Sequence, residues 1–413
     1  MRPEALLDDA LARAGDGGIS RETILLKLAD VAGHSNIETL KHYLALAEDR
    51  RRRRTDGASA LELQMPREGL EAADRVTEGA TRQPERIATM DTADFIRSLN
   101  AVGDSASFAE ICLAQTSMSP HVSMNLVADN GLVDDVLRHQ ARGWDWFLGS
   151  PDEDLRRVVA DYCLGSSLNG GYFTVAADGQ IAQWERGGSG SNALVDWLAD
   201  VRTRGLQPGI DITEPTEVLK ALGADLAGQP HTRKRAAICC EFADQGRLDE
   251  LVSMVAATET TLKDGSQGYR FCFSDVQRLV TLYPEGFGED PFRKKAILFF
   301  LLLSGHFVAR GRAVENDLPI PSDYQMGRGF AWKGVISVAP GLAAMLRSDA
   351  MLDVWSGEVM DYRAAAVVAA RCVGGLAGRE DWLVDGGLFG TWRKTSEFRT
   401  ESLPPARCNS IWF

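Results

Sequence analysis

The residue in this sequence that is best suited to chemistry is Asp323, within the stretch Ser322-Asp323-Tyr324. Pro319 and Pro321 precede it, and two prolines end any earlier helix and keep the backbone extended. Because the sequence from Tyr324 onward has a helical pattern, Asp323 is predicted at or near a helix N-cap, where a carboxylate stays ionised. An ionised carboxylate can stabilise developing positive charge and activate a water molecule. The simpler interpretation is that Asp323 only caps the helix.

Three residues at the end of a predicted helix also have two interpretations. Asn169 either caps the turn before a hairpin or reads the edge of a base. Tyr172 and Phe173 either pack in that hairpin, which is the usual role of aromatic residues there, or stack on a base.

Arg363 is the candidate cation of the C-terminal part. Its structural interpretation is an ion pair with Asp361 or Asp353. Its functional interpretation is a pair with Asp323 or a contact to a phosphate group, because guanidinium groups match carboxylate and phosphate geometry.

The elements that must position these residues are mostly helices. Leucine spacing, an acidic first turn and glycine or proline breaks define the candidates. The predicted helices are Thr92–Ala101, Val133–Arg142, Asp152–Cys163, Ser191–Arg202, Thr216–Leu222, Arg233–Gln245, Arg247–Ala257, Ser274–Tyr283, Pro291–Arg310, Tyr324–Lys333, Gly341–Arg347 and Glu358–Val373. One strand pair, Tyr172–Ala176 and Ile181–Glu185, is predicted around the Asp178–Gly179 turn. The predicted fold class is therefore mostly α with one small β-hairpin insertion.

The chain divides into three predicted parts. Residues 1–54 form a helical N-terminal extension that ends in five arginines, Arg50–Arg54, interpreted as a solvated helix end rather than a phosphate contact. Residues 55–90 are polar and without a clear period, which is typical of a linker. Residues 91–413 form the globular domain.

Composition excludes several classes of protein. The net charge of −13 argues against non-specific coating of nucleic acid, although a local basic groove would be compatible with it. The seven cysteines include no CxxC pair, which predicts free thiols rather than disulfides or a zinc site. Residues 1–9 lack a signal-peptide pattern, and the longest apolar run, Ala296–Leu303, is too short to span a bilayer. We therefore expect a cytoplasmic protein with no membrane contact and no metal or redox cofactor.

The stretch from Gly33 to Tyr43 resembles the active-site end of tyrosine recombinases. In that family a histidine assists a tyrosine nine residues later, and His34 and Tyr43 have this spacing. Phosphoryl transfer also needs cationic groups on the phosphate oxygens. That family supplies two arginines and a lysine from well upstream, and too few residues precede His34 to hold them. We interpret the stretch as an acquired fragment, compatible with an origin near a mobile element.

From Trp144 to the C-terminus the chain resembles the queuosine salvage family, hydrolases that release queuine from its sugar phosphate and whose fold is related to helical DNA glycosylases. Asp323 and Tyr324 match the family's Ala-Asp-Tyr-Arg-x-Pro-Gln stretch, in which the aspartate is catalytic, and Arg363 matches the arginine of its Glu-Ile-Arg-Ala-Ala-Thr helix. Further matching segments are Gly143-Trp144-Asp145, Leu168-Asn169, the loop 187–190, Tyr283-Pro284, Phe292-Arg293-Lys294-Lys295-Ala296 and the ending Arg407–Phe413.

The resemblance implies a DNA-glycosylase-like helical core with Asp323 as catalytic residue. It implies substrate-binding roles for Asn169, Tyr172, Phe173, Tyr324, Arg363 and Lys294. The family's aromatic after Asn169 is replaced by Gly170, and Gln325, Gly327 and Arg328 replace its Arg, Pro and Gln. These departures predict a roomier or differently lined pocket, and hence a substrate other than queuosine nucleotide.

Three functions follow from the resemblance. The first is a glycosylase that excises a bulky modified base from DNA, such as phage DNA in an antiviral setting, with the DNA as partner. The alternative is hydrolysis of queuosine 5′-phosphate, for which an acidic protein presents no difficulty. The third is a non-catalytic protein that binds modified nucleotides. The sequence leaves the identity of the base and the oligomeric state open.

Overall fold

The computed structural model describes residues 91–125, 131–138, 154–175, 180–348, 350–392, 395–408 and 410–411. Residues Thr92–Phe413 form one compact unit. The recombinase-like stretch 33–43, the arginine run 50–54, the predicted linker 55–90, the segment 143–145 and the predicted turn at 178–179 lie outside the described residues.

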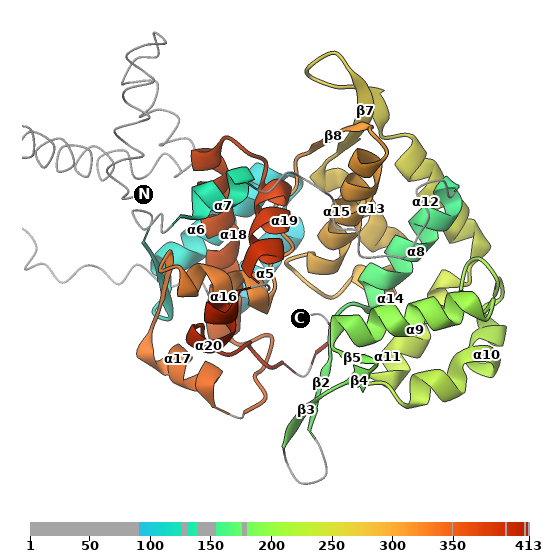
Figure 1. The fold of residues 1–413 in the computed structure, drawn as a ribbon, viewed down its shortest axis with the longest axis horizontal. Coiled ribbons are helices and arrows are strands. Elements are labelled where there is room, and N and C mark those ends of the chain that lie inside the picture. The colour runs from blue at the N-terminus through green and yellow to red at the C-terminus, as the bar shows by residue number, and fades with distance from the viewer. Residues whose placement is uncertain are drawn as a thin grey trace, which may run out of the picture. The chain divides into compact units, whose positions relative to one another are not determined.

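The described residues are mostly helical, which confirms the predicted class, with small sheets (Figure 1). The helices are α5 (Thr92–Ala101), α6 (Ser105–Met118), α7 (Leu132–Arg138), α8 (Leu155–Leu168), α9 (Ser191–Thr203), α10 (Pro215–Ala227), α11 (Thr232–Phe242), α12 (Gln245–Ala256), α13 (Phe273–Leu282), α14 (Pro284–Phe287), α15 (Lys294–Ala309), α16 (Tyr324–Trp332), α17 (Pro340–Arg347), α18 (Gly357–Ala377), α19 (Asp381–Trp392) and α20 (Ser396–Glu401).

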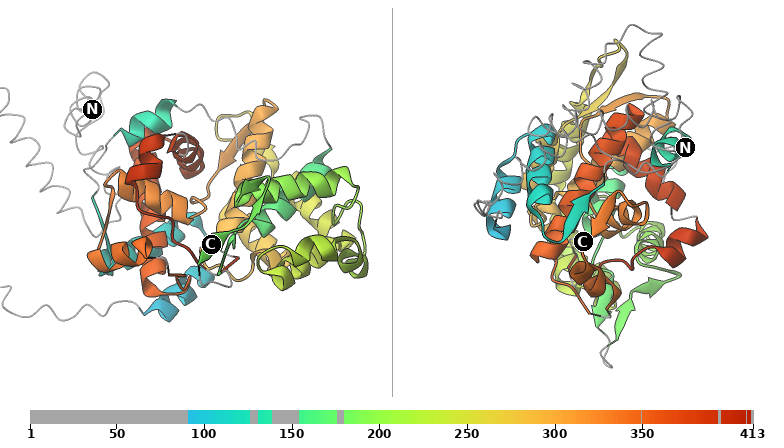
Figure 2. Two further views of the ribbon diagram at one scale, coloured as in Figure 1. Left: turned by 60° about the horizontal axis from the view of Figure 1, so that its bottom comes forward. Right: turned by 90° about the vertical axis from the view of Figure 1, so that its left-hand side faces the viewer.

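The helices gather into two groups, which Figures 1 and 2 show side by side. The terminal half consists of α5–α7 and α16–α20, in which α18 packs on α6, α7, α16 and α19. The middle half consists of α8–α15, in which α8 packs on α9, α11, α12 and α15. Segments from both ends of the compact unit therefore build the terminal half, while the middle half is continuous in sequence.

Buried contacts join the two halves. In the terminal half, Arg363 of α18 forms a two-pronged ion pair with Asp290, which precedes α15. The rings of Phe95 and Phe108 pack edge-on against Phe292, with centroids 5.9 and 6.3 Å away. These contacts fix the segment 290–294 against the terminal half.

Helix α15 is the apolar helix that the run Ala296–Leu303 predicts. Its side chains are buried from Lys294 to Gly305, so it forms the core of the middle half rather than a surface. Within the described ranges, no helix combines the length and apolarity needed to cross a membrane.

Four small sheets accompany the helices, so the prediction of one β insertion was incomplete. The predicted hairpin is present as β2 (Phe173–Val175) and β3 (Ile181–Gln183), with Phe173 opposite Gln183. The others are β1 (Val122–Met124) with β9 (Ile336–Val338), β4 (Glu185–Arg186) with β5 (Gly188–Ser189), and β6 (Glu259–Thr261), β7 (Gln267–Phe271) and β8 (Ala313–Asn316), of which β7 and β8 are parallel.

The seven cysteines all lie within the described residues and are free, as predicted. Five are buried, and Cys240 and Cys272 are half-buried. Burial raises the pKa of the Cys112 and Cys372 thiols, so these groups act as small apolar side chains in the core.

Candidate active site

Asp323 is the N-cap of α16, as predicted from the prolines before it. Its backbone is extended, and its Oδ1 accepts hydrogen bonds from the backbone N–H groups of Gln325 at 2.8 Å and Met326 at 3.1 Å. The first turn of α16 is therefore satisfied by one carboxylate oxygen. The second oxygen, Oδ2, has no hydrogen-bond partner among the described residues.

Asp323 lines a cavity between the terminal and middle halves, with about 80 Å³ of space, or room for roughly six water molecules at about 10–15 Å³ each. Its walls come from the end of α8, the start of α9 and the first turns of α15 on one side, and from residues 321–326 and α19 on the other. The lining residues are Asn169, Tyr172, Ser191, Lys294, Leu298, Pro321, Asp323, Tyr324, Gln325, Met326, Asp385 and Phe389.

Lys294 carries the cavity's ammonium group. The residue is 4% exposed, and its Nζ forms no hydrogen bond or ion pair with any described residue. Burial lowers the pKa of Lys294, while the carboxylates of Asp323, Asp290 and Asp385 oppose that shift. An unpaired buried ammonium is costly in free energy, so its position beside a carboxylate in a cavity is suited to an anionic or strongly polar ligand group.

Asn169 supplies an amide to the same cavity. It lies at the C-terminal end of α8, and its Oδ1 accepts a hydrogen bond of 2.6 Å from the hydroxyl of Tyr172. That bond fixes the orientation of the amide and leaves Nδ2 as a donor without a partner in the described part of the chain. The cavity therefore brings together a carboxylate oxygen, an ammonium and an amide N–H that are all available to a ligand.

The loop that carries Asn169 depends on two glycines and a buried arginine. Gly170 and Gly171 have φ of 138° and 62°, which side chains rarely adopt. Arg235 is fully buried, and its guanidinium donates to the carbonyls of Leu168 at 2.7 Å, Gly170 at 2.7 Å and Pro230 at 2.9 Å. Arg235 thus clamps the backbone on both sides of Asn169.

Arg363 does not line the cavity, and its ion pair in the described structure is with Asp290 rather than with the predicted Asp361, Asp353 or Asp323. Its two terminal nitrogens bind Asp290 at 2.8 and 2.9 Å, and both residues are 1% exposed. Asp361 instead accepts from Gln115 and Ser119. Arg363 acts on the site through the backbone, because its Nε donates to the carbonyl of Ser322, the residue before Asp323.

The remaining predicted residues differ in position. Tyr324 lines the cavity, and burial raises its pKa, with the Asp323 charge adding to the shift. Phe173 does not line the cavity but contacts the Tyr324 ring edge-on, with centroids 6.2 Å apart. Of the seven predicted residues, the cavity contains Asn169, Tyr172, Lys294, Asp323 and Tyr324.

Several lining residues were not predicted. Asp385 and Phe389 lie on α19, a helix that the sequence reading missed altogether, and Asp385 is 3% exposed. A buried second carboxylate in the same cavity as Asp323 is the most consequential of them. The only sequence signal was an aspartate inside an apolar stretch, Leu383-Val384-Asp385, which is unusual for a core helix.

The residues that depart from the family's stretch after Asp323 differ in position. Gln325 contributes its side chain to the cavity. At Gly327 and Gly329 the space that a side chain would need is filled, because a Cβ would lie 2.9 Å from the Tyr362 ring and 1.8 Å from the Trp392 ring. Gln325 is therefore a departure that changes the lining of the pocket, whereas neither glycine lines it, and the roomier pocket stays a prediction.

A scan of protein-family models finds no match for this chain, and a search of curated proteins finds none either.

Proposed function

We propose that this protein is an N-glycosidase that releases a modified nucleobase from its sugar, with Asp323 as the catalytic residue. The observation that supports this most is one cavity holding three polar groups that have no partner among the described residues: Oδ2 of Asp323, Nζ of Lys294 and Nδ2 of Asn169. The carboxylate suits the positive charge that develops on a sugar, and the cation suits an anionic or electron-rich oxygen. The amide suits the edge of a base.

The reaction is hydrolysis of the C1′–N bond. The bond breaks with its electron pair leaving on the base, positive charge develops on the sugar, and Oδ2 of Asp323 stabilises that charge from one face. Water forms the new C1′–O bond as one of its O–H bonds breaks, that proton passes to Asp323 and then to solvent, and the departing base takes up a proton from solvent. Such a preorganised group is worth about 3–4 kcal/mol in the transition state.

The other cavity groups hold the substrate. The amide of Asn169, fixed by Tyr172, donates to an acceptor on the base edge, and the Phe389 and Tyr324 rings offer apolar surface to the base plane. The ammonium of Lys294 donates to phosphate or sugar oxygens beside Asp323. Asp385 provides a second acceptor in the same cavity.

We propose DNA containing a bulky modified base as the substrate. Hydrolysis of a free modified nucleotide, of the queuosine 5′-phosphate type, is the second candidate, and the net charge of −13 favours it because long DNA binds best to basic surfaces. A third reading, binding without catalysis, uses the same cavity.

One experiment separates these functions. The full-length protein is incubated with phage DNA carrying hypermodified cytosine and with modified 5′-nucleotides, and released bases are measured by mass spectrometry. We expect free base and abasic sites from DNA with wild type and neither with Asp323→Asn. Release from nucleotides alone would support the second candidate.

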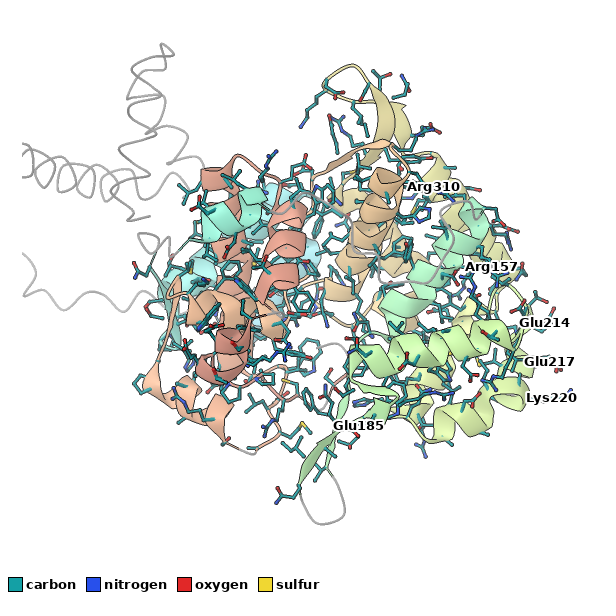
Figure 3. The ribbon with its side chains drawn as sticks, viewed as in Figure 1. Arg157, Glu185, Glu214, Glu217, Lys220 and Arg310 are labelled. Atoms are coloured by element: carbon teal, nitrogen blue, oxygen red, sulfur yellow. The ribbon has the colours of Figure 1, made fainter. Side chains whose placement is uncertain are left out.

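The matched control is Glu217→Gln on the outer side of α10 (Figure 3), whose carboxylate is 54% exposed and remote from the cavity. It should release base at the wild-type rate. Substrate binding by both wild type and Asp323→Asn, with no base released by either, would leave only the binding function.

A further inference from the structure

A second and larger cavity lies directly behind the active-site loop. It has about 640 Å³ of space, enough for a whole nucleotide, and its lining residues are His231, Lys234, Glu289, Met351, Leu352, Asp353, Val354, Trp355, Ser410 and Ile411. Gly171 packs closely against two residues that line this cavity, because a Cβ there would lie 2.6 Å from Cδ2 of His231 and 2.7 Å from Cα of Ile411. Asn169 and Tyr172, on either side of the two glycines, line the first cavity.

His231 is the polar group that most needs a ligand in this second cavity. Its backbone is left-handed, with φ of 53°, which costs a non-glycine residue free energy and is common at functional sites. Its Nε2 is buried and has no hydrogen-bond partner in the described structure. Burial lowers the pKa of His231, with Arg235 and Lys295 adding to the shift, so the imidazole is neutral near pH 7.

The charged groups of the second cavity do not select an anion. Lys234 is already paired with Glu289 at 2.6 Å and Glu285 at 2.9 Å. Asp353 adds a further negative charge, and its Oδ1 accepts from the backbone N–H of Trp355 at 2.9 Å. A phosphate or carboxylate ligand would therefore meet more carboxylates than free cations.

The apolar surface of the cavity suits a flat ring. Trp355 is 37% exposed, and few other large apolar side chains among the described residues are as exposed. Leu352, Val354 and Ile411, which line the same cavity, are buried. An exposed indole next to an unpartnered imidazole nitrogen offers stacking and one hydrogen bond, which are the contacts that a neutral heteroaromatic ring makes.

We propose that this second cavity binds the nucleobase adjacent to the one that is excised, so that the substrate is a nucleic-acid strand rather than a mononucleotide. The proposal rests on the proposed function and deepens it. The adjacent base stacks on Trp355 and hydrogen-bonds to Nε2 of His231, while the excised unit lies on the other side of Gly171 beside Asp323.

The test uses trideoxynucleotides with glucosylated 5-hydroxymethylcytosine in the centre and the fluorescent base 2-aminopurine on its 5′ or its 3′ side. Binding to the Asp323→Asn protein should quench the fluorescence of one of the two isomers, because an indole stacks on the probe. Trp355→Ala should abolish the quenching and weaken binding about five- to hundredfold, the range for one stacked base. His231→Asn, which tolerates a left-handed backbone, should weaken binding less.

The matched control is Trp332→Ala, another partly exposed tryptophan, which lines neither cavity. It should leave quenching and affinity unchanged. Equal quenching with Trp355→Ala and wild type, or none in any protein at millimolar trinucleotide, would overturn the proposal. Trp355-dependent quenching without base release by wild type would instead remove the proposed glycosidase activity and keep the base-binding site.

Discussion

Replacing Lys294 by methionine should make the protein more stable and less active at the same time. Methionine fills nearly the same space without a charge, and Lys294 is 4% exposed with no hydrogen-bond partner for Nζ among the described residues. Replacing buried ionic groups by apolar side chains of similar volume is often neutral or stabilising, by about 1–4 kcal/mol. The activity should fall at least a hundredfold, because the substrate oxygen that we propose Nζ binds would lose its donor.

The pH dependence of the free energy of unfolding tests independently whether the buried Lys294 charge destabilises the folded protein. Burial lowers the pKa of folded Lys294 below its usual value, so between the two pKa values the unfolded chain binds more protons than the folded protein. The wild-type free energy of unfolding therefore rises relative to that of Lys294→Met as pH increases toward the ordinary lysine range. Urea denaturation at several pH values measures this difference.

Lys295→Met is the matched control for Lys294→Met. Lys295 is also buried, but its Nζ donates to the backbone carbonyl of Ser167. Losing that bond leaves a buried carbonyl, so this variant should be less stable than wild type, by about 1–3 kcal/mol. The reasoning would be refuted by a Lys294→Met protein that is destabilised to the same extent, or one that retains full activity.

Three further predictions concern the frame of the site. Arg363→Met should destabilise the protein by about 3–5 kcal/mol, because it leaves Asp290 charged and buried. Adding Asp290→Leu should recover part of that loss in a double-mutant cycle measured by urea denaturation. A double variant whose loss equals the sum of the two single losses would contradict a direct pair. Gly171→Ala should cost more free energy than Gly205→Ala, because both have positive φ but only Gly171 has no room for a Cβ; equal melting temperatures would count against the close packing at Gly171. Burial raises the pKa of Asp381 to about 6, so the folded protein binds more protons than the unfolded chain between about pH 4 and 6. The free energy of unfolding should therefore fall as the pH rises through this range, by on the order of 2 kcal/mol in urea denaturation. Asp381→Asn should flatten that slope.

Local patterns in the sequence were enough to predict the cap at Asp323. Two prolines before an aspartate and a helical period after it define an N-cap through short-range sterics and hydrogen bonding, and the structure has that geometry. The central apolar helix and the hairpin β2–β3 were also predictable, because their signals lie within a few residues.

The pocket wall formed by α19 could not be predicted in the same way. The helix contains Gly386, Gly387 and Gly390, and apolar residues surround it on all sides, so no amphipathic period marks it. Asp385 therefore had no local context that placed it in one cavity with Asp323. The strands β6 and β7 did carry a signal, an Asp264-Gly265 pair between polar and aromatic residues, which was overlooked.

The partner of Arg363 was mispredicted for a different reason. Asp361 and Asp353 are both near Arg363 in sequence. Asp361, however, is two residues from Arg363 in α18, and residues two apart in a helix point to different sides. The actual partner, Asp290, lies in the other half of the unit and is brought near by the packing of Phe292 against Phe95 and Phe108. Such long-range pairs follow from tertiary packing and leave no trace in local spacing.

The central claim is that the free carboxylate oxygen of Asp323 drives cleavage of a glycosidic bond. Its most direct test is a single-turnover measurement of base release from one modified-base oligonucleotide by wild type and Asp323→Asn, with binding measured in parallel. We expect unchanged folding, binding within about tenfold, and release slowed by about 10²–10³-fold or more. Release by Asp323→Asn at the wild-type rate would contradict the claim.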